Sequence, residues 1–117
     1  MKTLTVFLTT PPYSHENTHS AIQLTRAALD RGWMVNLFAS ADGVYNFTRG
    51  HKAQGLPHAE HEFADLMARG LHVELCGTCL HFRGISAEHA APGAEPSSMK
   101  RLFGLAQNSD VFVTLGA

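Results

Sequence analysis

The sequence predicts an α/β fold of three layers, in which helices cover both faces of a parallel sheet of four to five strands. Apolar runs rich in β-branched and aromatic residues alternate along the chain with segments of helical period, the order that gives a parallel sheet with crossover helices. Glycines follow two of the helical segments, at the position where helices end. The length of 117 residues suits one core, so we expect a single domain over residues 1–117.

The first half of the chain contains two of these strands and one long helix. Residues 3–9 are predicted to form a strand that Pro11 and Pro12 terminate. A helix is expected over residues 18–31, because apolar side chains recur there at intervals of three and four and Gly32 follows. Residues 33–39 are the second predicted strand.

The middle of the chain contributes a short helix, a loop, a second long helix and a third strand. Residues 42–45 read as a capped turn that enters a short helix, and the polar residues 50–58 read as a loop. A helix is predicted over residues 59–69, and residues 71–75 form the third strand.

The last part of the chain predicts one more helix and its flanking strands. Two prolines interrupt residues 86–96, so any strand there is short. Ser97 or Ser98 is expected to cap a helix that carries Met99 and Leu102. Residues 110–115 are the last predicted strand.

Composition excludes several classes of function. The net charge of −1 gives no basic face for nucleic acid, and no segment approaches the roughly 20 apolar residues of a membrane span. The N-terminus carries no signal-peptide cleavage pattern, and two cysteines in such a chain indicate a reducing compartment. We therefore expect a cytoplasmic protein. No glycine motif for a dinucleotide or a triphosphate is present, so we expect no cofactor.

The chemistry-bearing residues follow the predicted strands. In parallel sheets ligands bind beyond the carboxyl ends of the strands. Tyr13 follows the first strand, Asp42 and Gly43 follow the second, and the segment from Cys76 to Arg83 follows the third. The only two cysteines, Cys76 and Cys79, are thereby expected at the functional edge of the sheet.

Four stretches of the chain resemble the DsrE/DsrF/TusD-like family of small sulfur-relay proteins. They are the turn after the first strand at Pro12 and Tyr13, residues 38–45, the segment from Cys76 to Gly84, and residues 99–115. In that family the sulfur-accepting cysteine stands eight residues before a glycine that follows an arginine, and Cys76, Arg83 and Gly84 reproduce this spacing. The Cys-Gly-x-Cys turn is most similar to the single-component branch of the family.

The resemblance implies a DsrE-like domain, flavodoxin-like in appearance, that assembles into a homo-oligomer such as a trimer or hexamer. It also implies that Cys76 accepts a persulfide sulfur from a donor protein and passes it to an acceptor protein. Such transfer needs a thiolate. Backbone N–H groups around Gly77 and Thr78 and the charge of Arg83 would stabilise that anion, and His81 would add charge or accept a proton. We expect Cys79 to resolve the persulfide.

Two other functions compete with this interpretation. Cysteine is among the most buried residue types, so both thiols would be packing residues in a non-catalytic oligomeric binding or regulatory protein. A thiol–disulfide redox protein would instead join Cys76 to Cys79. The helix after Cys79 must end near Gly84, whereas thioredoxin-type motifs open a long helix.

A metal site is the weakest alternative that the sequence offers. His15, Glu16 and His19 match the pattern H-E-x-x-H, in which two histidines on one helix face bind zinc. The pattern follows two prolines, at the entrance to the first helix instead of its interior. We therefore expect no resident metal, and Tyr13 is expected to line the pocket of the cysteines or to pack on the rim.

Overall fold

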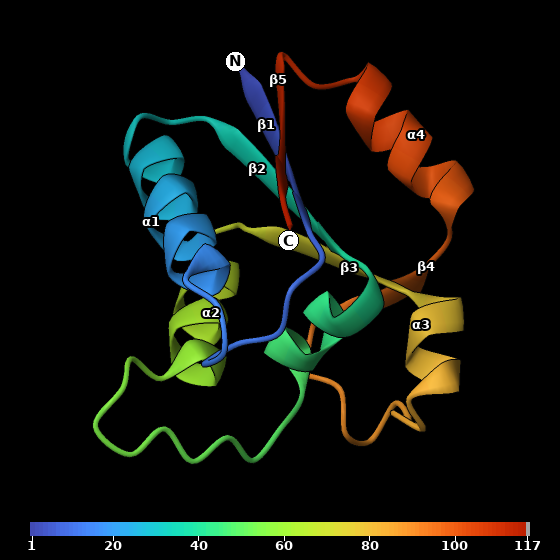
Figure 1. Ribbon diagram of the computed structural model, residues 1–117. Helices are drawn as coiled ribbons and strands as arrows, with labels where there is room; N and C mark the ends of the chain where they lie inside the picture. The colour runs from blue at the N-terminus through green and yellow to red at the C-terminus, as the bar shows by residue number, and fades with distance from the viewer. Residues whose placement is uncertain (117) are drawn as a thin grey trace.

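A computed structural model describes residues 1–116. Five parallel strands form one sheet in the order β4-β3-β2-β1-β5, which confirms the predicted fold class (Figure 1). The strands are β1 (Thr3–Leu8), β2 (Met34–Ala39), β3 (His72–Cys76), β4 (Glu95–Ser97) and β5 (Val111–Leu115). The central strand β2 pairs with β1 and β3, with Val6 opposite Leu37 and Leu37 opposite Val73.

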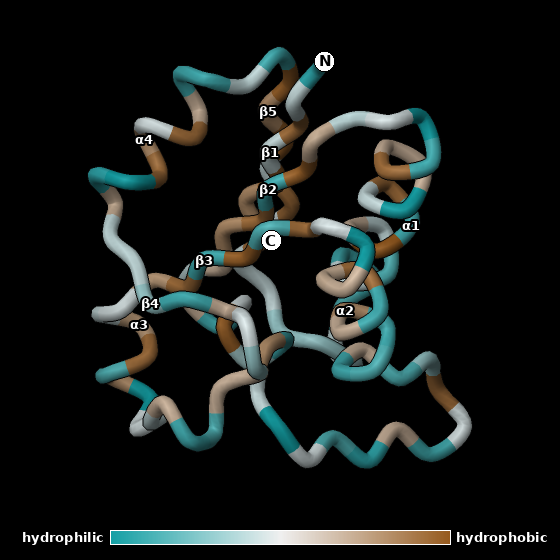
Figure 2. The backbone as a smooth tube through the Cα atoms, turned by 180° about the vertical axis from the view of Figure 1, so that it is seen from behind, coloured by the Kyte–Doolittle hydropathy of each residue, from teal (hydrophilic) through white to brown (hydrophobic). Residues whose placement is uncertain are grey.

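Helices lie on both sides of the sheet, as the sequence predicts. Helix α1 (Asn17–Asp30) and helix α2 (Ala59–Ala68) pack together on one face, whereas α4 (Met99–Gln107) lies on the other (Figure 1). The 3-10 helix η1 (Ala41–Phe47) and helix α3 (Gly77–Phe82) follow β2 and β3 at the carboxyl edge. Residues 50–58 form the expected loop, a largely hydrophilic segment that extends away from the sheet (Figure 2).

The ends of the elements follow from local chemistry. Gly32 and Gly70 have φ of 79° and 114°, the left-handed conformation that closes α1 and α2. The Ser98 side chain caps α4 by accepting a hydrogen bond from the Arg101 N–H at 3.5 Å. Pro96 lies in β4, an edge strand, where a missing N–H is tolerated. Trp33 was expected in the second strand, but the strand begins at Met34.

The two faces of the sheet differ in how well they are covered. The larger core lies under α1 and α2 and includes Val6, Leu37 and Val73, all fully buried. The core under α4 is small: its buried residues are Phe38, Cys76 and Leu102, and Leu102 is the only buried residue of α4. Helix α4 therefore covers its side of the sheet incompletely.

An ion pair between an exposed arginine and a buried carboxylate ties α4 to the sheet. Glu74 on β3 is fully buried and accepts hydrogen bonds from Arg101 Nε at 2.9 Å and Arg101 Nη2 at 3.1 Å. Ser97 Oγ and His72 Nε2 complete its shell, the latter at 2.6 Å. These partners satisfy a charge that would otherwise be costly to bury. They also fix Leu102, the neighbour of Arg101, above Cys76.

Candidate functional site

Both cysteines lie at the carboxyl edge of the sheet, as the sequence predicts. Cys76 is the last residue of β3, and Cys79 lies in the first turn of α3. Neither forms a disulfide. Both pack into the same small cluster under α4, so they form one thiol pair instead of two separate sites.

The Cys76 sulfur is buried, although the resemblance implies that this cysteine accepts sulfur from a donor protein. Cys76 is only 5 % exposed and packs with Phe38 and Leu102. The physical reason is that β3 extends one residue further than expected, so Cys76 belongs to the sheet and faces the core under α4. Burial raises the pKa of the Cys76 thiol, and the neighbouring Cys79 adds to this effect.

Cys79 has the surroundings expected for a thiolate. Its sulfur accepts a hydrogen bond from the Ala41 N–H at 3.1 Å and lies 3.6 Å from Ser40 Oγ. Burial of this half-buried sulfur opposes ionisation, but the neighbouring Cys76, the contacts with Ser40 and Ala41 and the charge of Arg83 outweigh it. The pKa of Cys79 is therefore lowered.

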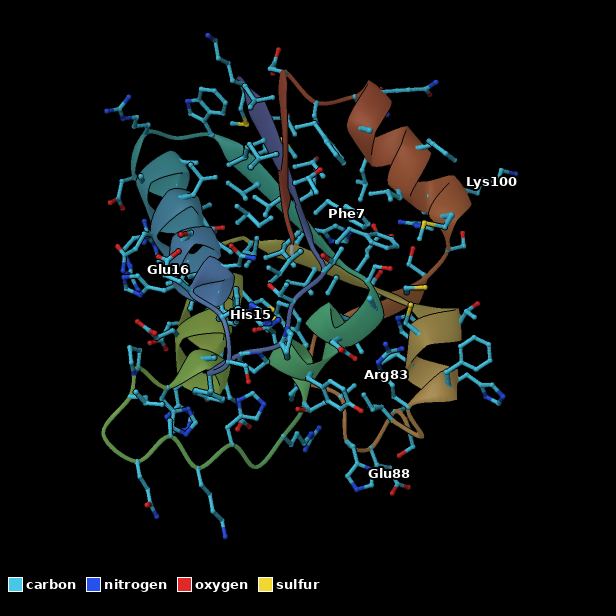
Figure 3. All side chains as sticks on the ribbon, in the orientation of Figure 1. Phe7, His15, Glu16, Arg83, Glu88 and Lys100 are labelled. Atoms are coloured by element: carbon cyan, nitrogen blue, oxygen red, sulfur yellow. The ribbon has the colours of Figure 1, made fainter. Side chains whose placement is uncertain are left out.

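Asp42 and Arg83 form an ion pair beside this sulfur. Arg83 Nε donates to Asp42 Oδ1 at 2.8 Å, and Arg83 Nη1 donates to the Cys79 carbonyl at 3.3 Å. The pair raises the pKa of Arg83. Figure 3 shows Arg83 between η1 and α3. Asp42 was interpreted as a cap, but η1 begins at Ala41, so its carboxylate instead positions Arg83.

The glycines of the predicted site allow close packing. A Cβ on Gly43 would lie 2.2 Å from the Leu8 carbonyl oxygen, so only glycine lets η1 approach the end of β1. A Cβ on Gly77 would lie 3.2 Å from the Ser97 carbonyl oxygen. Thr78 and His81 are exposed on α3, and the His81 ring lies beside Phe82, with ring centres 6.4 Å apart.

Tyr13 and the two histidines of the H-E-x-x-H pattern lie elsewhere. They line a separate cavity of about 170 Å³ with residues of α1 and α2, and Figure 3 places His15 at the end of α1. The Tyr13 hydroxyl bonds to His51 Nδ1 at 3.0 Å and accepts the Ala59 N–H at 3.3 Å. The prediction that Tyr13 lines the pocket of the cysteines is therefore not supported by its contacts.

The same region does not have the geometry of a zinc site. Helix α1 begins at Asn17, so His15 precedes the helix and the two histidines share no helix face. Within residues 1–116, no three His, Cys, Asp or Glu side chains cluster closely enough to hold a metal ion. Over the same residues, no helix has the length and apolarity needed to cross a membrane.

The sequence analysis did not identify three residues that contribute to the site. Ser40 directly follows β2 and was detectable by the rule that places functional groups after strands. Glu74 was detectable as a carboxylate inside an apolar strand. Ala41 acts through its backbone N–H, which no side-chain pattern records.

Known proteins are similar to this chain over nearly its whole length. Residues 2–115 match the model of the DsrE/DsrF-like family. An uncharacterised protein of Methanocaldococcus jannaschii is 31% identical over 110 residues, which cover 94% of this chain and 96% of the relative. The sulfurtransferase TusD of Sodalis glossinidius is 31% identical over 124 residues, with 92% of this chain and 94% of TusD covered.

Solved structures show the same fold. The ychN protein from E. coli superposes with a TM-score of 0.92 at 25% identity, over 98% of this chain and 100% of that one. A protein of unknown function from Methanobacterium thermoautotrophicum has a TM-score of 0.80 at 13% identity, with the same coverage. The family match over nearly the whole chain, together with the paired thiols after β3, leads to one conclusion: the chain belongs to the DsrE/DsrF-like family.

Proposed function

We propose that this protein is a sulfur carrier of the sulfurtransferase type, which receives a persulfide sulfur on the Cys76–Cys79 pair and passes it to a partner protein. Membership of a family that includes a TusD sulfurtransferase supports a sulfur relay in general. The observation that carries the proposal is the thiol pair itself, with one sulfur hydrogen-bonded to a backbone N–H and close to an arginine.

The pair suits this chemistry because only a thiolate attacks a sulfur atom efficiently. An ordinary cysteine is mostly protonated at neutral pH, whereas the surroundings of Cys79 favour its anion. The spacing to Gly84 favours Cys76 as the carrier and leaves Cys79 to resolve the persulfide. Burial and hydrogen bonding favour Cys79 as the attacking group. No cofactor is needed for either assignment.

The proposed partners are a sulfur-donor protein, a sulfur-acceptor protein and further copies of this chain, in the cytoplasm where thiols stay reduced. The exposed edge strand β5 and helix α4 support self-association, for which the family resemblance suggests a trimer or hexamer. Phe112 on β5 is 40% exposed and Phe103 on α4 is 69% exposed. Exposed apolar side chains beside an unpaired strand edge are typical of contacts between subunits.

Mass spectrometry of the intact protein tests the function. The reduced protein is incubated with a cysteine desulfurase and cysteine, or with a rhodanese and thiosulfate, and is analysed without reductant. We expect a gain of one sulfur atom, which a double variant carrying C76S and C79S does not show. A wild-type protein that gains no sulfur from either donor system contradicts the proposal.

A thiol–disulfide redox function is the second candidate, favoured by the packing of both cysteines in one cluster. It predicts that a mild oxidant removes two hydrogen atoms from the protein and that a small thiol restores them. The same mass spectra distinguish the two functions, because sulfur transfer adds mass and disulfide formation removes it.

A further inference from the structure

The positions of the two sulfurs assign different roles to them. We propose that Cys79 attacks the donor and carries the persulfide, whereas Cys76 keeps its proton and packs beside it. This inference rests on the proposed function and reverses the assignment that spacing alone favours. It also makes Ser40, Ala41 and the Asp42–Arg83 pair the positioning groups of the reaction.

The first support is the shape of the chain around Ala41. Its N–H donates to the Cys79 sulfur at 3.1 Å, and its φ of 52° lies in the left-handed region. A residue other than glycine in this conformation costs on the order of 1–3 kcal/mol and persists only where its surroundings enforce it. Here Gly43 presses against Leu8, and its N–H bonds to the Ser40 carbonyl at 2.9 Å. The donor to the sulfur is therefore rigidly placed.

The second support is the charge beside Cys79. Arg83 is fixed by Asp42 at 2.8 Å and by the Cys79 carbonyl at 3.3 Å, so its guanidinium stays close to this cysteine. A fixed positive charge stabilises a thiolate more than a mobile one, because no ordering cost arises when the anion forms. The charge of Arg83 is among the causes that lower the pKa of Cys79.

The third support is the opposite situation of Cys76. Its side chain lies under Leu102 and against Phe38, where an anion would lose its hydration. Cys76 therefore stays protonated when Cys79 ionises. Cys79 is also the more exposed of the two, so a donor protein reaches it first.

The transfer itself balances without an added oxidant or reductant. The Cys79 thiolate attacks the outer sulfur of the donor persulfide, R–S–SH. A bond forms between the Cys79 sulfur and that outer sulfur, the sulfur–sulfur bond of the donor breaks, and the donor leaves as the thiolate R–S⁻. The product is Cys79–S–SH. Because Cys76 stays protonated, it does not attack the inner sulfur and expel sulfide.

Matched serine variants test the assignment. C76S keeps a hydroxyl that can donate to Cys79, whereas C79S keeps an acceptor but removes the proposed nucleophile. After incubation with a cysteine desulfurase and cysteine, we expect C76S to gain sulfur about as fast as wild type and C79S to lose at least about tenfold in rate. Fragmentation of the wild-type peptide should place the extra sulfur on Cys79.

The results distinguish failure of the Cys79 assignment from failure of the proposed sulfur-carrier function. Extra sulfur on Cys76 in wild type, together with full loading of C79S, overturns the inference and leaves the sulfur-carrier function intact. No extra sulfur in wild type overturns the function itself. If C76S fails to fold, the wild-type fragmentation still decides between the two sulfurs.

The pH dependence of alkylation reports the ionisation of Cys79. A purely structural role of Arg83 would leave this ionisation unchanged. In wild type we expect iodoacetamide to react with Cys79 before Cys76, with a midpoint below that of a free cysteine. R83Q should raise this midpoint, whereas R31Q, which changes an exposed arginine at the end of α1, should not. Equal midpoints in R83Q and wild type contradict the role of Arg83.

Discussion

The buried carboxylate of Glu74 offers the sharpest test of how the core under α4 is held. Its hydrogen bonds from Arg101, Ser97 and His72 lower its pKa from 4.5 to about 2, with Arg101 as the largest cause. E74Q replaces a carboxylate, which only accepts hydrogen bonds, with an amide whose NH₂ group donates them. Because Arg101 and Ser97 also donate, the hydrogen bonds of wild type cannot all form. The variant should therefore lose the interaction that ties α4 to β3.

The size of the effect follows from linkage. At about 1.4 kcal/mol for each pH unit, a pKa near 2 in the folded protein against an unfolded value near 4.5 corresponds to at most about 3–4 kcal/mol at pH 7. Water reduces this value, because Arg101 is 61% exposed. Since the folded pKa is the lower one, the stabilisation is complete above about pH 5 and declines as the pH falls toward 2.

Urea unfolding at two pH values measures this contribution. The free energy of unfolding of E74Q should lie about 2–3 kcal/mol below wild type at pH 7, and the difference should shrink to about 1 kcal/mol at pH 3. E88Q is the matched control, because Glu88 is exposed on the loop after α3 (Figure 3). If the free energies of unfolding of wild type and E74Q differ by the same amount at both pH values, ionisation of Glu74 does not stabilise the fold.

The same variant connects the core to the thiol pair. Leu102 covers Cys76 and follows Arg101 directly, so release of α4 should expose the Cys76 sulfur. Alkylation of Cys76 at pH 7 should become faster in E74Q than in wild type, whereas E88Q should leave it unchanged. An unchanged rate in E74Q would show that α4 holds its place without Glu74.

Three further outcomes are expected. D42N should raise the pH midpoint of Cys79 alkylation, because the amide no longer fixes Arg83 beside the sulfur; an unchanged midpoint argues against this positioning role. G43A should lower the melting temperature strongly, because its Cβ would lie 2.2 Å from a backbone oxygen, whereas G55A, with nothing within 4 Å but a φ of 71°, should lower it less; equal effects would contradict the packing argument. F112E should lower the particle mass measured by light scattering if the proposed subunit contact includes β5, because Phe112 is 40% exposed on this edge strand; an unchanged mass excludes β5 from that proposed contact.

Much of the fold was predictable because it depends on local signals. Side-chain periodicity and the glycines after α1 and α2 identified the long helices to within one or two residues. The alternation of strands and helices then required a parallel sheet, and the parallel sheet required the loops after the strands to meet at one edge. These steps depend on neighbours in the chain, so the sequence carries them directly.

The sequence by itself therefore determined the family, the parallel sheet and the presence of two cysteines at its carboxyl edge. Only the tertiary structure decided that Cys76 faces the core, that Ala41 and Arg83 lie against Cys79, and that Tyr13 belongs to another cavity. The reason is that ionisation of a thiol depends on burial and on donors contributed by other segments. Ala41 is 38 residues away along the chain yet 3.1 Å from the Cys79 sulfur.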